Sequence, residues 1–305
     1  MAGAINWDIT IHVNTFPRKG EQRVIGSMTR APGGKAGNTA VAIAKLLGGG
    51  QSAIIGAVAK DSLGSEHARI LSDEGVVVAG LKFCEGVESG QAYAIVDENG
   101  DNVIYSYRGA NETFRPEDLD EPKRRQLISD ASIIVIMNPP YETALKLAKF
   151  AKLSRKTVVW DPGLEAESGA AKTRGLLENV DYLIANQFEI QSLTGVRNYD
   201  KAAGRLIRIN PKLRVVAKLG PKGCVMYHDK KHIVSRALQL KSLGLKVVST
   251  VGCGDAFLGA FVAALSEGRS ELEALKWGNC AGGLKATKIE ARGSPDRQTL
   301  LDYLA

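Results

Sequence analysis

A single aspartate stands directly after three small residues and directly before a long apolar run. In TVGCGDAFLGAFVAAL, residues 250–265, Gly252, Cys253 and Gly254 precede Asp255. Small residues at the start of a helix let backbone N–H groups converge on an anion, and the helix N-terminus adds about half a positive charge there. We therefore predict that this segment binds a phosphate group.

An anion bound there would repel the carboxylate of Asp255, so the presence of an acid at this position needs a chemical reason. A carboxylate so placed can accept the proton of a hydroxyl group that attacks a phosphoryl group, while the N–H groups stabilise the transferring oxygens. The alternative is a plain first-turn acid that the helix dipole favours. The sequence contains no G-x-x-x-x-G-K-[ST] loop and no G-x-G-x-x-G after an expected strand, which argues against a P-loop enzyme and a dinucleotide enzyme.

From about residue 131 onward, short apolar runs alternate with amphipathic helical stretches, which is the pattern of an α/β fold. Strands that are buried on both faces read as continuous apolar runs, so we expect a parallel sheet covered by helices. The expected strands are residues 132–137, 157–160, 181–185 and 213–220.

Two pairs of expected strands interrupt this alternation, residues 8–14 with 22–30 and residues 91–97 with 102–108. The second pair is joined across Asn99-Gly100, a strong hairpin signal. Each pair alternates apolar with polar residues, so each has one wetted or ligand-facing side. We interpret them as a small separate sheet, a candidate lid.

Residues 225–234 also resemble a hairpin, with a turn at the DKK sequence. His228 and His232 are four residues apart, a spacing that could bind a metal on a helix but does not place both on one helical face in a hairpin. We therefore do not expect a metal site there.

Composition is that of a folded, water-soluble chain. Of the 305 residues, 44% are hydrophobic and 24% charged, and the net charge is +7. Basic residues are interspersed with acidic ones, as in residues 121–130, and aromatics make up only 6%, so we expect no nucleic-acid partner. With no apolar run of 18 residues and no secretory pattern at the start, we expect a cytoplasmic protein without a membrane partner. Reduced thiols are expected for Cys84, Cys224, Cys253 and Cys280.

Several motifs resemble, in order and spacing, those of the ribokinase (PfkB) family of carbohydrate and nucleoside kinases. The segment around Asp255 is similar to that family's D-T-x-G-A-G-D signature. The other similar stretches, which together cover nearly the whole chain, are GAINWDI (3–9), APGGKAGNTAVAIAKLLG (31–48), GAVAKDSLG (56–64), RGAN (108–111), ANQFE (185–189) and KLGPKG (218–223).

The resemblance implies roles for individual residues. Asp255 becomes the catalytic base, and the N–H groups of Gly252, Cys253 and Gly254 become the anion cradle. The residues expected to contact the acceptor are Asn6, Asp8, Gly34, Lys35, Asn38 and Asn138. Without the family, Asp8 and Asn38 would be interpreted as a strand-edge acid and a helix-start residue.

The nucleotide side is implied in the same way. In the N-x-x-E motif, Asn186 and Glu189 are expected one helical turn apart, beside the triphosphate, with Glu189 holding Mg²⁺ through water. The alternative is a helix cap followed by a first-turn glutamate. The remaining nucleotide contacts are expected from Lys218, Gly220, Gly223 and Asn279.

The chain departs from the family pattern at a few positions. Ser249 stands where potassium-activated members carry an aspartate that helps bind the cation, so monovalent-cation activation is doubtful. Cys253 replaces an alanine, and we interpret it as a small substitute rather than a catalytic thiol. Asn138 stands where ribokinases place a sugar-contacting glutamate. Only Met1 and Ala2 precede Gly3, so the first strand is expected to be trimmed or stunted.

These observations predict one domain, residues 1–305, built as a three-layer α/β/α sandwich with a mostly parallel sheet and a small β lid from about 8–30 and 91–108. The expected activity is Mg²⁺-dependent transfer of the γ-phosphoryl group of ATP to a hydroxymethyl group of a sugar or nucleoside. The alternatives are a sugar-phosphate kinase of the same family, for which Lys35 or Arg108 could bind the second phosphate, and a non-catalytic regulator. A homodimer through the lid is also considered.

Overall fold

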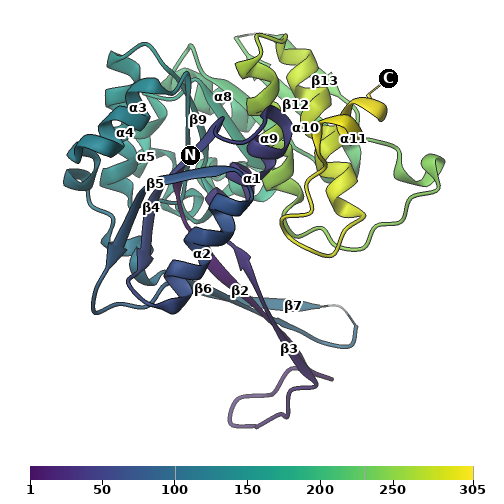
Figure 1. Cartoon of the computed structure of the whole chain (residues 1–305). Coiled ribbons are helices and arrows are strands. Elements are labelled where there is room, and N and C mark those ends of the chain that lie inside the picture. The colour runs from purple at the N-terminus through teal and green to yellow at the C-terminus, as the bar shows by residue number, and fades with distance from the viewer. Residues whose placement is uncertain (100, 230, 305) are drawn as a thin grey trace.

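A computed structural model of the chain describes residues 1–99, 101–229 and 231–304, and its largest element is a nine-stranded sheet (Figure 1). The strand order is β13-β12-β11-β10-β9-β8-β1-β4-β5. Neighbours from β5 to β11 are parallel, whereas β12 and β13 are antiparallel. The strands are β1 (Ala2–Gly3), β4 (Ser52–Ala59), β5 (Val76–Cys84), β8 (Ile133–Met137), β9 (Thr157–Asp161), β10 (Tyr182–Asn186), β11 (Arg214–Lys218), β12 (Cys224–His228) and β13 (Lys231–Ser235).

Helices cover both faces of this sheet, and alternate strand residues contact the two helical layers. On β8, Val135 belongs to one hydrophobic core and Ile134 and Ile136 to the other. The first core is built with α1 (Lys35–Leu47), α2 (Ser62–Asp73), α9 (Cys253–Ser266), α10 (Glu271–Ala286) and α11 (Arg297–Asp302). The second is built with α3 (Pro122–Asp130), α4 (Tyr141–Leu153), α5 (Gly169–Lys172), α6 (Arg174–Leu177), α7 (Gln187–Thr194) and α8 (Tyr199–Ile209). The predicted three-layer α/β/α fold is therefore confirmed.

The lid is a separate four-stranded sheet in the order β3-β2-β6-β7. Its strands are β2 (Asn6–His12), β3 (Ser27–Gly33), β6 (Gly90–Val96) and β7 (Asn102–Tyr107). Strands β2 and β6 are parallel, and the two outer pairs are antiparallel. In Figure 1 this sheet projects away from the helical layers.

The expected bounds of the first pair of lid strands need correction, since the strand expected at residues 8–14 is Asn6–His12. The strand expected at residues 22–30 begins at Ser27 and continues to Gly33, because its partner β2 begins at Asn6 and the register pairs Asn6 with Gly33. The second expected pair matches β6 and β7, although Gly100 of the predicted turn lies outside the described residues.

The predicted hairpin of residues 225–234 corresponds to β12 and β13, and Lys230 of its turn lies outside the described residues. His232 pairs with Tyr227, whereas His228 pairs with Lys231. Because neighbouring residues of a strand point to opposite faces, the two histidines lie on opposite faces of the hairpin. Among the described helices, none is long and apolar enough to cross a membrane.

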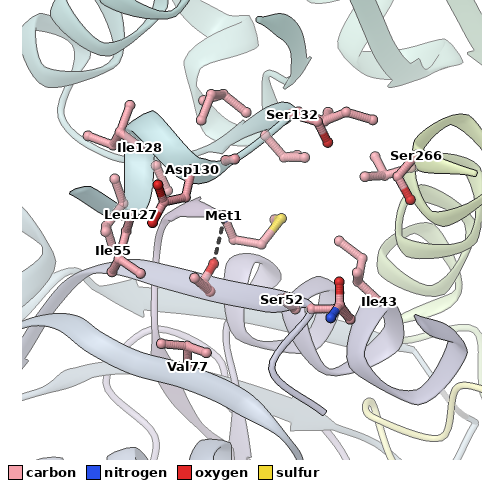
Figure 2. Close-up of a pocket in the computed structure, with 18 of the residues that line it drawn as sticks. Met1, Ile43, Ser52, Ile55, Val77, Leu127, Ile128, Asp130, Ser132 and Ser266 are labelled. Atoms are coloured by element: carbon pink, nitrogen blue, oxygen red, sulfur yellow. Dashed lines mark hydrogen bonds between the residues drawn. The ribbon is translucent and has the colours of Figure 1, made fainter. Parts of the chain in front are cut away.

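A pocket of about 340 Å³ lies beside the short strand β1, at the amino ends of β4 and β8 (Figure 2). Strand β1 pairs with Ile55 of β4 and with Ile136 of β8, so no strand separates the first residues of β4 and β8. Met1 lines this pocket, and its amino group donates to the carbonyl of Ala53 at 2.7 Å. This edge is opposite to the carboxyl edge, where parallel sheets place their ligands.

Candidate active site

Gly252 begins α9 in a conformation that only glycine adopts without strain. Its φ is +83°, and a Cβ atom there would lie 2.1 Å from the carbonyl oxygen of Ala291. The chain turns sharply at Gly252 and brings Asp255 into the first turn of α9, as the sequence predicts. The turn thus fixes where the predicted base lies.

Asp255 is almost completely buried, with 6% of its surface exposed. Its Oδ2 accepts a hydrogen bond of 2.9 Å from Nδ2 of Asn38, on α1. Burial raises the pKa of Asp255 to about 6, although Lys35 and the hydrogen bond from Asn38 act in the opposite direction. At neutral pH the carboxylate is mostly ionised and is basic enough to accept a proton.

The amide groups around Gly252 differ in their partners. The N–H of Cys253 donates to the carbonyl of Thr250 at 3.2 Å, so this group is turned toward its own loop. In the described part of the chain, the N–H groups of Gly252 and Gly254 have no hydrogen-bond acceptor. The predicted cradle of three N–H groups is therefore reduced to two in this conformation, because Cys253 closes the turn.

Cys253 lies in this turn with its thiol partly buried. Its Sγ is 3.7 Å from the carbonyl oxygen of Ser249, and burial raises the pKa of the thiol. A raised pKa keeps the sulfur protonated and weakly nucleophilic. This favours the interpretation of Cys253 as a small residue of the turn.

Two lysines flank a buried aspartate at the carboxyl edge of the sheet. Asp161, the last residue of β9, has no exposed surface. Its Oδ1 lies 2.6 Å from Nζ of Lys35, and its Oδ2 lies 3.1 Å from Nζ of Lys218. Lys35 also lies 3.3 Å from Oε1 of Glu189. A Cβ atom on Gly254 would be 3.3 Å from Nζ of Lys218, so this charged cluster adjoins the start of α9.

The pairing fixes the charge state of this cluster. Burial opposes ionisation of Asp161, but Lys218 and Lys35 together lower the pKa of its carboxyl group. Burial likewise opposes the charge on Lys35, but the negative charges of Asp161 and Glu189 raise the pKa of the lysine above its ordinary value. Lys35 therefore remains cationic beside the predicted anion site.

Asp8 and Gly34 lie together where the lid meets the sheet. A Cβ atom on Gly33 would be 2.0 Å from Oδ2 of Asp8, so glycine is required for this close approach. Burial and, next, the charge of Asp255 raise the pKa of Asp8 to about 6, whereas Arg292 and a hydrogen bond with the Gly34 backbone lower it. The structure thus brings Asp8 into the electrostatic field of Asp255.

Asn6 is held by Asn111 of the RGAN segment. Nδ2 of Asn111 donates to Oδ1 of Asn6 at 2.9 Å and to the carbonyl of Ile5 at 3.2 Å, and Oδ1 of Asn111 accepts from the N–H of Ile5 at 2.9 Å. Asn111 therefore ties the beginning of the lid to the segment that follows β7.

Asn138 follows β8 with φ of +59°, an unusual backbone conformation for a residue other than glycine. Its buried Oδ1 has no hydrogen-bond partner within the described residues. A Cβ atom on Gly163 would be 2.4 Å from this oxygen. Nη2 of Arg108 donates to the carbonyl of Asn138 at 3.3 Å, which places Arg108 beside this position.

Asn186 and Glu189 form a capping box at the start of α7. Oδ1 of Asn186 accepts from the N–H groups of Phe188 and Glu189, both at 2.9 Å, and Oε2 of Glu189 accepts from the N–H of Asn186 at 2.7 Å. The cap that was the alternative interpretation is therefore present. The cap uses only one carboxylate oxygen of Glu189. The other, Oε1, accepts a hydrogen bond of 3.3 Å from Nζ of Lys35 in the charged cluster.

Two of the residues predicted on the nucleotide side, Asn279 and Gly223, meet at Ser235. Nδ2 of Asn279 donates to the carbonyl and to the hydroxyl oxygen of Ser235, both at 3.0 Å. Gly223 has φ of +91°, and a Cβ atom there would lie 2.1 Å from the same carbonyl oxygen. Gly220 has φ of +57° at the start of this turn. These contacts fix the turn after β11.

Sequence reasoning did not single out Asp161 or Arg292. Arg292 is 6% exposed and donates to Oδ1 of Asn38 at 3.1 Å and to the carbonyl of Gly33 at 3.2 Å, so it orients the amide that contacts Asp255. It also pairs with Glu74 at 3.1 Å. The sequence does carry one indication that Asp161 belongs to the site, because a carboxylate follows directly after a buried strand. No comparable pattern marks Arg292.

Metal-binding side chains do not gather into a preformed site in the described residues. No group of three or more histidine, cysteine, aspartate or glutamate side chains is arranged to hold an ion there. The carboxylates of Asp161 and Glu189 are nevertheless joined through Lys35, and Lys218, the other partner of Asp161, adjoins Gly254 at the start of α9. One or two carboxylates together with substrate phosphates are the usual environment of Mg²⁺, so this donor set fits that ion.

Comparisons with known proteins give one consistent result. The family model of the pfkB carbohydrate kinases matches residues 2–297. An ATP-dependent ribose-1-phosphate kinase from Halopiger xanaduensis is 29% identical and covers 100% of this chain and 97% of that relative.

Two solved structures are similar along almost the whole chain. The ribokinase of Thermotoga maritima has a TM-score of 0.85 at 27% identity. The ribokinase of Arabidopsis thaliana, complexed with ribose and ATP, has a TM-score of 0.85 at 26% identity. Each comparison covers 99% of this chain and 97% of the other. With Asp255, Asn38 and the glycine turn assembled at one edge of the sheet, this chain belongs to the pfkB family of carbohydrate kinases.

Proposed function

We propose that the protein transfers the γ-phosphoryl group of ATP to a hydroxymethyl group of a sugar or nucleoside. The observation that carries this proposal is the position of Asp255, a buried carboxylate at a helix N-terminus. It lies near two lysines and beside two N–H groups that have no acceptor among the described residues. The names of the relatives, ribokinase and ribose-1-phosphate kinase, support an ATP-dependent kinase with a hydroxyl acceptor.

In the proposed step, Asp255 accepts the proton of the acceptor hydroxyl as its oxygen forms a bond to the γ-phosphorus. The bond between this phosphorus and the oxygen that bridges it to the β-phosphate breaks, and ADP leaves with the bond electrons. The N–H groups of Gly252 and Gly254 and the ammonium group of Lys218 stabilise negative charge on the transferring oxygens. Asn38 holds the carboxylate in place.

The acceptor lies between the lid and the sheet in this proposal. Asp8 accepts hydrogen bonds from hydroxyl groups, and Gly34 lets the ring approach the backbone. Asn6 and Asn138 complete the contacts. The buried Oδ1 of Asn138 lacks a partner among the described residues, and a donor from the acceptor would supply it.

ATP binds along the carboxyl edge, with its phosphates at the start of α9 and its base near Gly220, Gly223 and Asn279. Glu189 and Asp161 would hold Mg²⁺ through water molecules, and this ion would offset part of the phosphate charge. Lys35, paired with both carboxylates, keeps them oriented toward the phosphates. We also propose that the protein acts in the cytoplasm.

A sugar phosphate is a second candidate acceptor. Arg108 supports it: its guanidinium contacts the carbonyl of Asn138, and its partner Glu112 is half-exposed at the base of the lid. Arginine binds phosphate in a bidentate manner, so exchange of Glu112 for a substrate phosphate would be favourable. The relative named ribose-1-phosphate kinase also supports this candidate.

The experiment is a coupled ADP-release screen with ATP and Mg²⁺ over ribose, fructose, adenosine, inosine, cytidine and ribose 1-phosphate, with mass spectrometry of each product. We expect one acceptor class to gain a phosphoryl group. The control is Asp255→Asn, nearly isosteric, which should lower kcat by roughly a hundredfold to ten-thousandfold while ATP still binds. Near-normal turnover of that variant would remove the role of Asp255 as the base.

A further inference from the structure

Among the lysines that the structure describes, Lys285 is completely buried. Lys285, near the end of α10, has 0% of its surface exposed. Its ammonium group donates to the carbonyl of Ser249 at 3.1 Å and to the carbonyl of Lys288 at 3.0 Å. In the described chain both hydrogen-bond acceptors are main-chain carbonyls, and the charges of Glu290 and Asp255 act on the ammonium group without a direct ion pair.

An ammonium group in such a position is costly. Burial favours the neutral amine and lowers the pKa of Lys285. Replacing a buried ion by an apolar side chain of similar size is often neutral or stabilising. A purely structural role therefore does not explain the charge, and its location is the informative feature.

Lys285 lies where two segments meet directly before the anion cradle. The N–H groups of Val248 and Ser249 both donate to the carbonyl of Ala286, at 2.7 and 3.1 Å. Gly252 packs against the carbonyl of Ala291, with no room for a Cβ atom. The segment that enters α9 is thus held against the loop that leaves α10, and the ammonium group bridges carbonyls of both.

Converging carbonyl oxygens are also the environment in which proteins hold a monovalent cation. Here the positive charge is supplied by a side chain of the chain itself. Its electrostatic effect reaches the start of α9, because Lys285 acts to lower the pKa of Cys253 and Asp255 acts to raise that of Lys285. The ammonium group of Lys285 therefore lies close enough to act on the start of α9, where the phosphate is predicted to bind.

We propose that Lys285 is a positioning residue for the anion cradle: a built-in cation that clamps residues 248–252 to the loop after α10 and makes the reaction independent of an exchangeable monovalent cation. This inference rests on the proposed function for its kinetic readout. A binding readout tests it independently of turnover.

The first test uses the wild-type protein. The rate of phosphoryl transfer and the rise in Tm on adding Mg²⁺ and ATP are compared in potassium chloride and in tetramethylammonium chloride of equal ionic strength. Equal values in both salts are expected. A requirement for potassium in either readout would overturn the proposal. If no acceptor is phosphorylated, the proposed function fails, while the shift in Tm still tests Lys285.

The second test compares two substitutions of Lys285. Lys285→Met keeps the volume and removes the charge, and it should lower kcat by roughly a hundredfold, the lower end of the loss for a removed oxyanion donor. Lys285→Ala leaves space, so potassium, ammonium or methylammonium ions should restore part of its activity. The same ions should not restore the methionine variant, whose side chain fills the site.

The matched control is Lys276→Met, which removes an exposed lysine from the same helix and should leave kcat unchanged. Thermal denaturation of every variant shows whether it is folded. Wild-type kinetics in Lys285→Met, or a folded Lys285→Ala that no small cation activates, would overturn the role of the charge. If the alanine variant does not fold, the methionine variant and the wild-type salt comparison still test the role of the Lys285 charge.

Discussion

Asp255, which is buried, and Asp8, which is partly buried, share one electrostatic environment. Each has a pKa raised to about 6, and the charge of Asp255 contributes to the shift of Asp8. Arg292 opposes the shift of Asp8 and orients Asn38, which contacts Asp255. A single arginine from outside any helix or strand therefore tunes both carboxylates.

The pH dependence of the reaction follows from these two groups. Both act in the ionised form, one as base and one as hydrogen-bond acceptor, so kcat/KM for the acceptor should decrease as the pH falls through about 6. At pH 5 we expect a loss of roughly tenfold for each group that must be ionised, or about a hundredfold for both. The measurement is a pH profile of kcat/KM from pH 5 to pH 8.

Asp8→Asn is the control for this profile. The variant should have a higher KM for the acceptor, and the low-pH limb of its profile should depend on one ionisation instead of two. A profile that stays flat down to pH 5 would contradict the assignment of both acids. Because their pKa values are higher in the folded than in the unfolded protein, their contribution to the free energy of unfolding decreases as the pH rises from about 4 to 6.

Residues of the site differ in how far the sequence could predict them. Asp255, Asn38 and Lys35 stand in motifs with a chemical reason, and the structure brings them together. Asp161 directly follows an expected strand, but its two lysine partners come from positions 126 and 57 residues away along the chain. No local pattern encodes such a pairing, because it depends on the order of strands in the sheet.

At the scale of elements, the amino ends of two helices supply several groups of the candidate active site. The start of α9 supplies the anion cradle, and the start of α7 supplies Glu189 through a capping box. The expected strands matched the sheet closely, since buried parallel strands are continuous apolar runs. The expected bounds of β3 did not match the structure, because this exposed edge strand contains Pro32 and takes its register from β2.

A comparison of two helix-cap variants separates the structural role of Asn186 from its proposed role in ATP binding. Asn186→Ala removes the cap of α7, and Asn198→Ala removes the cap of α8, where Oδ1 of Asn198 accepts from the N–H of Lys201 at 2.9 Å. Each should lower the free energy of unfolding by about 1 kcal/mol. We expect only Asn186→Ala to raise the KM for ATP.

Chemical denaturation and steady-state kinetics of both variants make this comparison. An unchanged KM for ATP in the Asn186 variant, with the same loss of stability as the Asn198 variant, would reduce Asn186 to a cap. An increase in KM confined to Asn186→Ala supports its place beside the triphosphate.

At the scale of the whole molecule, the lid leaves apolar surface exposed. Ile104 and Tyr105, neighbours on β7, point to opposite faces of the lid, and both are more than half exposed, at 58% and 63%. Strand β7 is also an edge of the lid sheet, with one side free to pair. A second copy of the chain would cover both features, so we propose a homodimer formed through the lid.

Sedimentation velocity over a range of protein concentrations tests this proposal. The wild type should sediment as a dimer, and Ile104→Lys should shift it toward the monomer, because the lysine would bury a charge in the interface. The control is Leu153→Lys, which replaces an equally apolar side chain that is 86% exposed on α4, away from the lid. A monomeric wild type, or equal effects of both substitutions, would contradict the dimer.

The attachment of the lid to the sheet has a mechanical consequence. Strand β1 lies in the middle of the large sheet, and only Ala4 and Ile5 separate it from β2. The N–H of Ala4 is bonded to Met137 at 3.0 Å, and both backbone polar groups of Ile5 are bonded to Asn111. These hydrogen bonds hold the two-residue connection firmly, so we expect any movement of the lid to bend its strands rather than to rotate the lid about Ala4 and Ile5.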